Sequence, residues 1–205
     1  MTIRRSRIRW TRVVGVLVLV AAIVVAVGSR LSASLPSVTA LPSTAVSTLD
    51  AFHGGNGEAD GHVPDGTTVF DDDVPAVAKL DRALLDAVRQ AATDAADDGI
   101  TVLVNSGWRT PKYQARLLRE AVSTYGSEAE AARWVATAKS SPHVSGDAID
   151  VGPYDAQAWL SEHGAAYGLC RIYDNEPWHY ELRRGAVRNG CPPTYADPTA
   201  DPRMH

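Results

Sequence analysis

Two short segments, far apart in the sequence, hold residues that can serve one metal ion only if the fold brings them together. The first runs from Ser141 to Asp150 and contains His143, and the second contains Glu176 and His179. Two imidazoles and one carboxylate supply three protein ligands, which leaves a fourth coordination position open for water. A nearby Glu can take that water's proton. These are the parts of a zinc hydrolase site, so the two segments must converge.

The residues between the first two ligands suit a crowded site. Gly146 allows the backbone to turn, and Ala148, on the same side of a strand as Asp150, leaves space beside a metal. The spacing of His143 and Asp150 carries little information alone, since a chain of this length can contain it by chance. Taken singly, His179 could also be a core histidine and Glu176 a solvated turn residue. Their occurrence together favours the metal site.

A basic N-terminus precedes an apolar run. Residues 1–30 carry six Arg and no acidic residue, so the remainder has a net charge of −10, which argues against nucleic acid as a partner. As a helix, the uncharged run over residues 13–29 would reach roughly 26 Å, near the lower limit for crossing a bilayer. By the positive-inside rule we expect an extracytoplasmic protein, anchored to the cytoplasmic membrane by this single helix or secreted if it is a cleaved signal peptide. A buried core helix fits less well, because five Arg directly precede the run.

Composition divides the rest of the chain. Residues 31–66 are rich in Ser, Thr, Pro, Ala and Gly and lack an apolar period, which predicts a flexible linker. We expect one domain over residues 67–195 and an irregular tail over residues 196–205. Cys170 and Cys191 fall in the exported part, where oxidising surroundings favour a disulfide between them. Zinc ligation by these cysteines and two unpaired thiols remain as alternatives.

The first half of the domain reads as mostly helical. Apolar residues at helical spacing predict a helix over 75–96, and a β-branched run over 100–104 predicts a buried strand. Thr110, followed by Pro111, has N-cap chemistry for a second helix, and Ser127 opens a capping box for a third that continues to residue 138.

The second half supplies more strands. We expect a helix over 154–167 and strands over 148–151, 169–173 and 178–182. Helices first and strands mostly later indicate an α+β domain with a small, mainly antiparallel sheet flanked by helices.

Three blocks of the chain resemble the signature blocks of the VanY-type D-alanyl-D-alanine carboxypeptidases, which belong to a zinc metallopeptidase superfamily with related dipeptidases, endolysin endopeptidases, lysostaphin and hedgehog domains. The resemblance covers about residues 70–185 and implies a hedgehog/DD-peptidase-like fold with one Zn²⁺ ion. The blocks are Ser106-Gly107-Trp108-Arg109, Ser141-x-His143-x-x-Gly146-x-Ala148-x-Asp150 and Glu176-x-Trp178-His179.

By this resemblance, His143, Asp150 and His179 are the zinc ligands, and Glu176 is the general base that later protonates the leaving amine. Arg109 matches a family arginine that holds or polarises the substrate, and its guanidinium could stabilise the oxyanion. Alternatively, Arg109 is a surface residue that caps the next helix.

Three further residues are assigned to the substrate by the same resemblance. Ser141 and Gln114 could bind the terminal carboxylate or backbone of a peptide, or could serve only as loop and helix-surface residues, and Trp178 would contact the substrate. Trp108 replaces the family's usual Tyr, and Pro142 and Ser145 replace commoner residues, so the shape of the pocket is not predicted.

The resemblance implies an extracytoplasmic zinc peptidase, expected as a monomer, that removes the terminal D-Ala of peptidoglycan stem peptides. The alternatives are a D,D-dipeptidase or an endopeptidase that cuts cross-links or the L-Ala-D-Glu bond with the same core. A non-catalytic, zinc-containing wall-binding module is a further alternative, although it would have no need of a base such as Glu176. The ligand set also accepts other first-row divalent ions.

Overall fold

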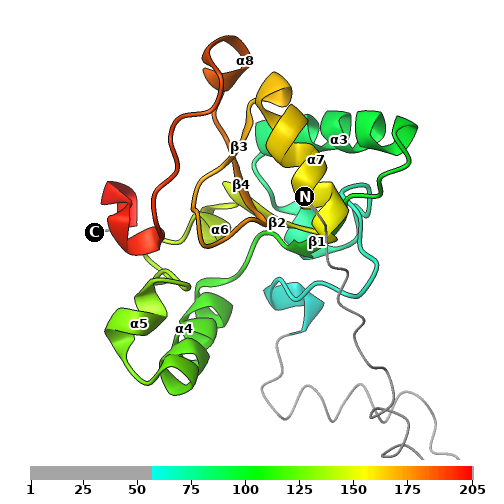
Figure 1. Ribbon diagram of the computed structural model, residues 1–205. Helices are drawn as coiled ribbons and strands as arrows, with labels where there is room; N and C mark the ends of the chain where they lie inside the picture. The colour runs from blue at the N-terminus through cyan, green and yellow to red at the C-terminus, as the bar shows by residue number, and fades with distance from the viewer. Residues whose placement is uncertain (1–56, 205) are drawn as a thin grey trace, which may run out of the picture. The chain divides into compact units, whose positions relative to one another are not determined.

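A four-stranded antiparallel sheet organises the part of the chain that the structure describes. The computed structural model describes residues 57–204. The strands lie in the order β1-β2-β4-β3, and each neighbouring pair is antiparallel (Figure 1). This small sheet with its helices confirms the predicted α+β class. The strands are β1 (Leu103–Ser106), β2 (Ala148–Gly152), β3 (Leu169–Arg171) and β4 (His179–Leu182).

One face of the sheet packs on two helices, α3 (Arg82–Asp97) and α7 (Tyr154–His163), which lie on the same side of the sheet in Figure 1. The short 3-10 helix η2 (Gly164–Tyr167) continues α7 and contacts α3. Successive side chains of a strand point to opposite faces, so alternate residues of the central strands enter this core. Buried residues of this core include Leu84, Leu160, Ile149, Val151 and Tyr180.

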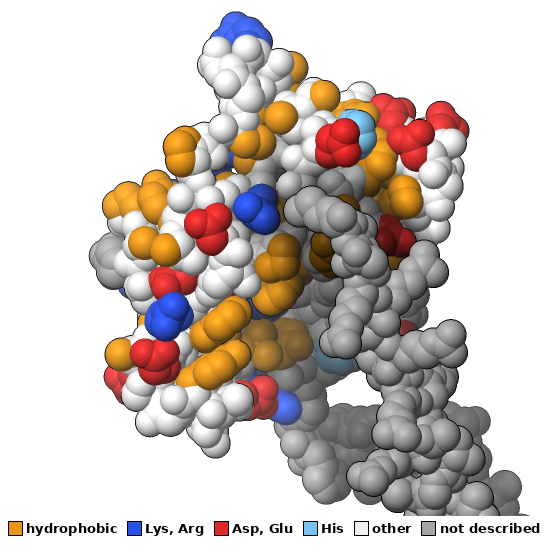
Figure 2. Space-filling view, in the orientation of Figure 1, with side chains coloured by type: hydrophobic (Ala, Val, Ile, Leu, Met, Phe, Trp, Pro, Cys, Tyr) orange, Lys and Arg blue, Asp and Glu red, His pale blue; other side chains and the backbone are white. Residues whose placement is uncertain are grey.

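The helices α4 and α5 lie away from α3 and α7. Figure 1 shows α4, α5 and the C-terminal end in this region. In Figure 2, hydrophobic side chains gather over the lower part of the described surface, with charged side chains of both signs among them. The bounds are α4 (Pro111–Tyr125), α5 (Glu128–Ala132), α6 (Pro142–Ser145), η3 (Pro198–Ala200) and η4 (Pro202–Met204), with η1 (Glu58–Asp60), α2 (Pro75–Ala78) and α8 (Ala186–Asn189) elsewhere.

The first predicted helix is divided in two, so the expectation of one continuous helix over residues 75–96 is wrong. Asp81 separates α2 from α3 because it caps the second helix. Its Oδ1 accepts the backbone N–H groups of Ala83 at 3.0 Å and Leu84 at 3.1 Å. Its own N–H donates to the carbonyl of Gly146 at 2.8 Å, which ties the break to the loop before β2. An N-cap residue has non-helical dihedral angles, so the helix cannot run through it.

The first strand begins later than predicted, because Ile100 closes the end of α3. Gly99 takes a left-handed φ of +77°. The N–H of Ile100 then donates to the carbonyl of Ala95 at 2.9 Å, and that of Gly99 to Ala96 at 3.0 Å. These two bonds form a Schellman motif, which uses the first residue of the predicted strand to satisfy helix carbonyls. The strand β1 therefore starts at Leu103.

Thr110 and Ser127 cap the next two helices, as their sequences predict. The Thr110 hydroxyl accepts the N–H of Tyr113 at 3.1 Å, and the Ser127 hydroxyl accepts the N–H of Glu130 at 3.2 Å. The reciprocal half of the capping box is absent here, because the Glu130 carboxylate pairs with Arg133 at 3.3 Å. One bond is thus enough to start α5.

The helix α5 is shorter than predicted and ends at Ala132 instead of residue 138. Beyond it the chain turns so that the carbonyl of Ala136 accepts a hydrogen bond from the Gln114 side chain at 2.9 Å. Because Gln114 is only 1% exposed, its amide needs such partners inside the protein. A long-range contact therefore overrides the local helical pattern.

The packed structure extends beyond the predicted domain bounds at both ends. Residues 57–66, assigned to the linker from composition, are in contact with the domain, since Asp60 accepts the N–H of Thr110 at 2.9 Å. In the C-terminal tail, Asp197 accepts a bond from Arg133 at 2.9 Å. The predicted anchor or signal segment and the rest of the linker lie outside the described residues. Within residues 57–204, no helix is long and apolar enough to cross a membrane.

A disulfide joins Cys170 of β3 to Cys191, which confirms the predicted pairing. The bond closes a loop with a sequence separation of 21 residues. Closing a loop of this size stabilises a fold by about 3 kcal/mol on the chain-entropy model. It fixes the segment that follows β4 to the edge strand of the sheet.

We predict that Asp81→Ala lowers the free energy of unfolding by about 1 kcal/mol, because two N–H groups of α3 lose their acceptor. Urea denaturation followed by circular dichroism measures this difference. Asp86→Ala is the matched control: it removes a carboxylate from the same helix whose contact with Arg82, at 3.7 Å, is exposed. Equal stability of the two variants would show that the cap contributes nothing.

Candidate active site

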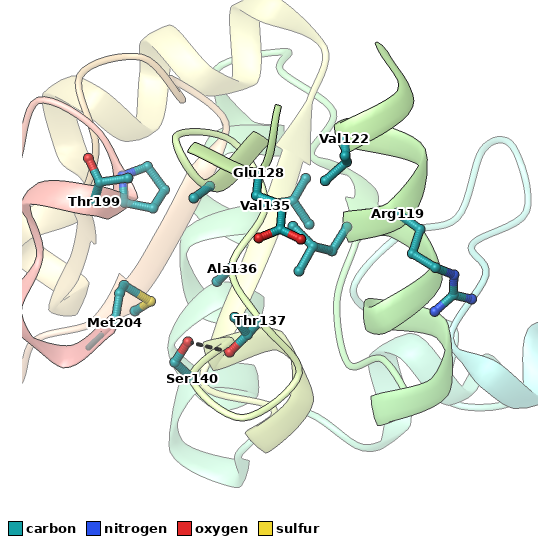
Figure 3. A pocket seen from close by; sticks show the side chains of 12 residues that line it. Arg119, Val122, Glu128, Val135, Ala136, Thr137, Ser140, Thr199 and Met204 are labelled. Atoms are coloured by element: carbon teal, nitrogen blue, oxygen red, sulfur yellow. Dashed lines mark hydrogen bonds between the residues drawn. The ribbon is translucent and has the colours of Figure 1, made fainter. Parts of the chain in front are cut away.

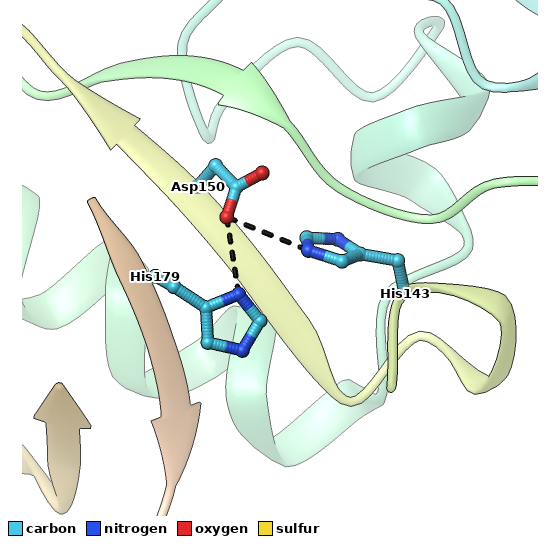
Figure 4. A group of neighbouring side chains, drawn as sticks. All are labelled: His143, Asp150 and His179. Carbon is cyan, nitrogen blue, oxygen red and sulfur yellow. Dashed lines mark hydrogen bonds and ion pairs between the residues drawn. The ribbon is translucent and has the colours of Figure 1, made fainter. Parts of the chain in front are cut away.

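The pairing of β2 with β4 places the first two candidate ligands side by side. Asp150 and His179 are directly opposite each other in the antiparallel register. Both side chains leave the sheet on the face away from the core, because Ile149 and Tyr180, their chain neighbours, point into it. Figure 4 shows the Asp150 carboxylate between the imidazoles of His179 and His143.

The third candidate ligand comes from the short helix α6. His143 is the second residue of that helix, which ends at Ser145 and has Gly146 as its C-cap. Gly146 has a φ of +83°, and a Cβ there would lie 2.6 Å from the carbonyl oxygen of Lys79. Only glycine fits this turn, which leads directly into β2. The N–H of Arg109 donates to the carbonyl of His143 at 3.0 Å and holds the helix against the loop after β1.

Two of the distances between donor atoms of the three residues match those of a tetrahedral metal site. Asp150 Oδ1 lies 3.4 Å from His143 Nε2 and 3.2 Å from His179 Nδ1. Ligand atoms of all three residues lie within 4.8 Å of one another, and the three side chains are buried. Ligands about 2.1 Å from a tetrahedral zinc are separated by about 3.4 Å. The residues therefore fit one small divalent cation.

Each imidazole is oriented by a partner on its other nitrogen. His143 Nδ1 lies 2.8 Å from the carbonyl oxygen of Gly107, so this nitrogen carries the proton and Nε2 is free to accept. His179 Nε2 lies 3.3 Å from Oε1 of Glu181. A hydrogen bond on the second nitrogen fixes the tautomer and the ring plane, as is usual for metal-bound histidines.

Arg109 forms a hydrogen bond with the second carboxylate oxygen of Asp150. Its guanidinium donates to Asp150 Oδ2 at 3.0 Å, to Ser106 Oγ at 2.7 Å and to Gln114 Oε1 at 3.0 Å. This leaves Oδ1 facing both imidazoles, so Asp150 is arranged to bind a cation through one oxygen. The alternative of Arg109 as a surface helix cap is wrong, since Thr110 is the cap and the Arg109 side chain is 13% exposed.

Gln114 lies beneath Arg109 with both ends of its amide engaged. Its oxygen accepts from Arg109, and its nitrogen donates to the carbonyl of Ala136. The alternative that Gln114 is only a helix-surface residue is wrong, because this residue is 1% exposed. These contacts make Gln114 a residue that positions Arg109, while direct contact with a substrate stays a prediction.

The charges around the cluster set its protonation. Burial raises the pKa of Asp150, but the imidazoles of His143 and His179 and the Arg109 guanidinium outweigh it and hold that pKa well below its usual value. Burial lowers the pKa of His143 and nearby Arg109 adds to this, which keeps the ring neutral and able to bind a cation. Burial also lowers the pKa of His179, yet hydrogen bonds to Asp150 and Glu181 raise it to about 9.

Glu176 lies beside the cluster without joining it. Its Oε2 is 3.8 Å from His179 Nδ1, and its Oε1 is buried with no hydrogen-bond partner. Burial raises the pKa of Glu176 to about 7, despite the opposing effect of His179. A carboxylate with a pKa near neutrality can both accept and return a proton. The position suits a base that acts on a molecule held at the cluster.

A cavity of about 470 Å³ opens onto these residues. Ser141, whose buried Oγ has no partner, and the half-buried Trp178 line it together with the three candidate ligands and Glu176. Tyr125 and Trp134 line it farther from the cluster and stack with ring centroids 5.8 Å apart. No sequence pattern predicts this stack, because the two rings meet only through the turn between α4 and α5.

The contact of Glu181 with His179 was not predicted from the sequence, although the spacing of the two residues indicates it. Glu181 follows His179 by two positions, so on a strand both side chains point to the same face. Burial raises the pKa of Glu181, but hydrogen bonds from His179 and Arg203 outweigh this and lower the pKa to about 2. Glu181 is therefore a buried carboxylate that stays ionised behind the site.

A second cavity, of about 560 Å³, lies beside the first between α4, the segment after α5 and the C-terminal residues (Figure 3). Both cavities are lined by Val135, Ala136 and Pro198, so these residues lie between them. The other lining residues of the second cavity are mixed: Leu118, Val122, Ala132 and Met204 are apolar, and Arg119 and Glu128 are charged. The cluster of candidate ligands opens only onto the first cavity among those described.

Comparison with known proteins gives this geometry a family. The family model of VanY, D-alanyl-D-alanine carboxypeptidase, matches residues 77–183. A D-alanyl-D-alanine carboxypeptidase of Enterococcus faecalis (strain ATCC 700802 / V583) is 32% identical over 108 residues, with 40% of this chain and 40% of that protein covered. The chain thus matches less than half the length of this curated relative.

Two solved structures share the fold. VanYB in complex with D-alanine-D-alanine has a TM-score of 0.50 and 26% identity, over 54% of this chain and 74% of that chain. The LdcB LD-carboxypeptidase has a TM-score of 0.50 and 22% identity, over 62% of this chain and 71% of that chain, a likeness of fold alone. The family model spans more than half of the sequence and both blocks of candidate ligands. The chain belongs to the VanY family of D-alanyl-D-alanine carboxypeptidases.

Proposed function

We propose that this protein is a zinc-dependent D-alanyl-D-alanine carboxypeptidase that trims peptidoglycan stem peptides outside the cytoplasmic membrane. The observation that carries the proposal is the convergence of His143, Asp150 and His179 within 4.8 Å of one another. Glu176, a base with a free buried oxygen, opens onto the same cavity. Family membership and the solved complex of VanYB with D-alanine-D-alanine support the choice of substrate.

His143, Asp150 and His179 would hold the cation through Nε2, Oδ1 and Nδ1, the atoms that face one another in the structure. A bound zinc ion supplies Lewis acidity to the scissile carbonyl and lowers the pKa of a coordinated water. Two imidazoles and one carboxylate suit zinc best, while other first-row ions could occupy the same set.

Glu176 carries the proton through the reaction. Its free Oε1 accepts a proton from the attacking water while the water oxygen bonds to the carbonyl carbon of the peptide. The same carboxyl group then donates that proton to the nitrogen of the leaving D-alanine as the C–N bond breaks. One proton is taken and one is returned, so Glu176 ends the cycle ionised.

Arg109 and Ser141 would act on the substrate. Arg109 uses three of its N–H groups on Asp150, Ser106 and Gln114, which fixes the guanidinium plane and leaves further N–H groups toward the cavity that it lines. A fixed positive charge there stabilises the oxyanion without reorganisation. The unpartnered Ser141 Oγ is available to the peptide backbone or its terminal carboxylate, and Trp178 to the apolar part of the peptide.

We further propose that residues 1–30 direct the domain across the cytoplasmic membrane and either remain as its anchor or are removed. Residues 31–56 would then serve as a linker, and the domain would act as a monomer on the wall. This placement agrees with the substrate, because stem peptides are assembled into the wall outside the membrane.

The bond that is cut can be identified by incubating the purified protein with a defined pentapeptide stem and weighing the products. Release of a single D-Ala supports the proposal. Release of the D-Ala-D-Ala dipeptide, or cutting only within the stem or its cross-links, would assign the same site to a dipeptidase or an endopeptidase. No cleavage by a zinc-loaded protein would favour a wall-binding module.

We predict that His143→Ala and His179→Ala each abolish stoichiometric zinc binding, because three protein ligands are reduced to two. Metal analysis after dialysis should give one zinc ion per wild-type chain. A chelator should lower the melting temperature of the wild type and leave that of the two variants unchanged. His163→Ala is the control, since this side chain is 44% exposed and should have no influence on metal content. Wild-type zinc content in a ligand variant would contradict the assignment.

We predict that Glu176→Gln keeps the metal and the fold but lowers kcat by about 10²–10⁴-fold, because the amide cannot accept the proton. D-Ala release, zinc content and melting temperature are measured on the same preparation. Glu162→Gln, at a side chain that is 79% exposed, makes the same chemical change on the surface and should keep full activity. Substantial activity of the Glu176 variant would remove this residue from its role.

A further inference from the structure

The C-terminal tail, residues 196–204, reaches the carboxylate behind the candidate metal site. Arg203 donates to Glu181 Oε2 through NH1 at 2.7 Å and to Oε1 through NH2 at 3.2 Å. Glu181 is 1% exposed, whereas the Arg203 side chain is 40% exposed, so the two-point contact joins a buried carboxylate to a guanidinium that reaches the surface. An arginine fork that binds both oxygens fixes the plane of a carboxylate as well as its charge.

The same carboxylate orients one of the proposed ligands. Glu181 Oε1 lies 3.3 Å from His179 Nε2, while His179 Nδ1 faces Asp150. Arg183 also contacts Glu181, but only at Oε2, at 2.8 Å. One contact neutralises charge without fixing the plane, so the direction of Oε1 toward the imidazole depends on Arg203.

Asp201 holds Arg203 in place and reaches His179 by a second route. Asp201 is fully buried and accepts the backbone N–H of Arg203 at 2.9 Å and its Nε at 3.0 Å. The Tyr173 hydroxyl donates to Asp201 Oδ2 at 3.0 Å, and the Tyr173 ring lies 5.1 Å from the His179 ring. Two residues of the tail therefore act on the imidazole, one through Glu181 and one through the Tyr173 ring.

We propose that the C-terminal tail is a positioning element of the metal site, in which Arg203 holds Glu181 so that His179 keeps the tautomer and ring plane that present Nδ1 to the cation. This inference rests on the proposed binding of a divalent cation by His143, Asp150 and His179. Arg203 touches neither the cluster nor the cavity that opens onto it, so its role is positioning and not catalysis.

The experiment is a double-mutant cycle on zinc affinity in the full chain, with Arg203→Ala, Glu181→Gln and the two combined. Competition with a chelator gives the zinc dissociation constant, and the absorption spectrum of the Co²⁺-loaded protein reports the geometry of the ligands. Arg203→Ala should raise the dissociation constant by about 10–100-fold, as loss of an outer contact to a metal-bound histidine does. The combined variant should bind zinc no more weakly than Glu181→Gln alone, because Arg203 acts through Glu181.

Two further variants separate positioning from general stability. Arg203→Lys keeps the charge without the fork and should give an intermediate dissociation constant; it also serves if Arg203→Ala does not fold. Arg171→Ala is the control, because it removes an arginine of β3 whose ion pair with Asp174, at 3.7 Å, is at the surface. It should leave zinc affinity and the Co²⁺ spectrum unchanged.

Three results would overturn the inference. Wild-type zinc affinity and Co²⁺ spectrum in a folded Arg203→Ala or Arg203→Lys protein would show that the tail does not position His179. Additive losses in the combined variant would show that Arg203 acts through general stability. Failure of the wild type itself to bind zinc would overturn the proposed function, and this inference with it.

Discussion

The register between β2 and β4 is the constraint on which the site depends. It sets Asp150 opposite His179, and the two-residue period of the strands then sends His179 and Glu181 to one face and Tyr180 to the other. Tyr180 is 1% exposed and packs in the core with Ile149. A slip of one residue would move Tyr180 out of the core and turn His179 into it. The hydrophobic core therefore fixes the relative position of Asp150 and His179, although none of its residues lines the cavity.

The same face carries two buried carboxylates, and each is matched by an arginine from outside the sheet. Asp150 is paired with Arg109 from the loop after β1, and Glu181 with Arg203 from the tail. A buried carboxylate without a partner is strongly destabilising, so each needs a cation: Asp150 has Arg109, and Glu181 has Arg203 together with Arg183, at 2.8 Å. His179 lies between the two pairs and contacts both carboxylates. The loop with Arg109 and the tail with Arg203 are thus linked to the candidate site by charge pairs.

Local chemistry explains what the sequence could predict. The candidate ligands His143, Asp150 and His179 can be recognised in the sequence because metal ligands are a narrow set of residue types. Thr110 marks a helix start because its hydroxyl bonds three residues ahead. Predictions failed where distant residues decide the outcome. The chain leaves the helix after Ala132, and the carbonyl of Ala136 then binds the buried amide of Gln114. The sequence around Ala132 contains no sign of this distant partner. Nothing in the Pro-rich sequence around Arg203 indicates its contact with Glu181, which forms only in the folded protein.

Asp150 and Glu176 line one cavity, and their neighbours shift the pKa values of the two carboxyl groups in opposite directions. Asp150 is surrounded by two imidazoles and a guanidinium, so its pKa falls well below its usual value and it remains an anion suited to a cation. Glu176 is buried with one oxygen unpartnered and an imidazole only at 3.8 Å, so burial prevails and its pKa rises to about 7. A group that must exchange protons near neutrality has to be poorly solvated and weakly paired, whereas a ligand has to be strongly paired. The difference in pKa between Asp150 and Glu176 therefore comes from the contacts that the fold provides and not from the carboxylates themselves.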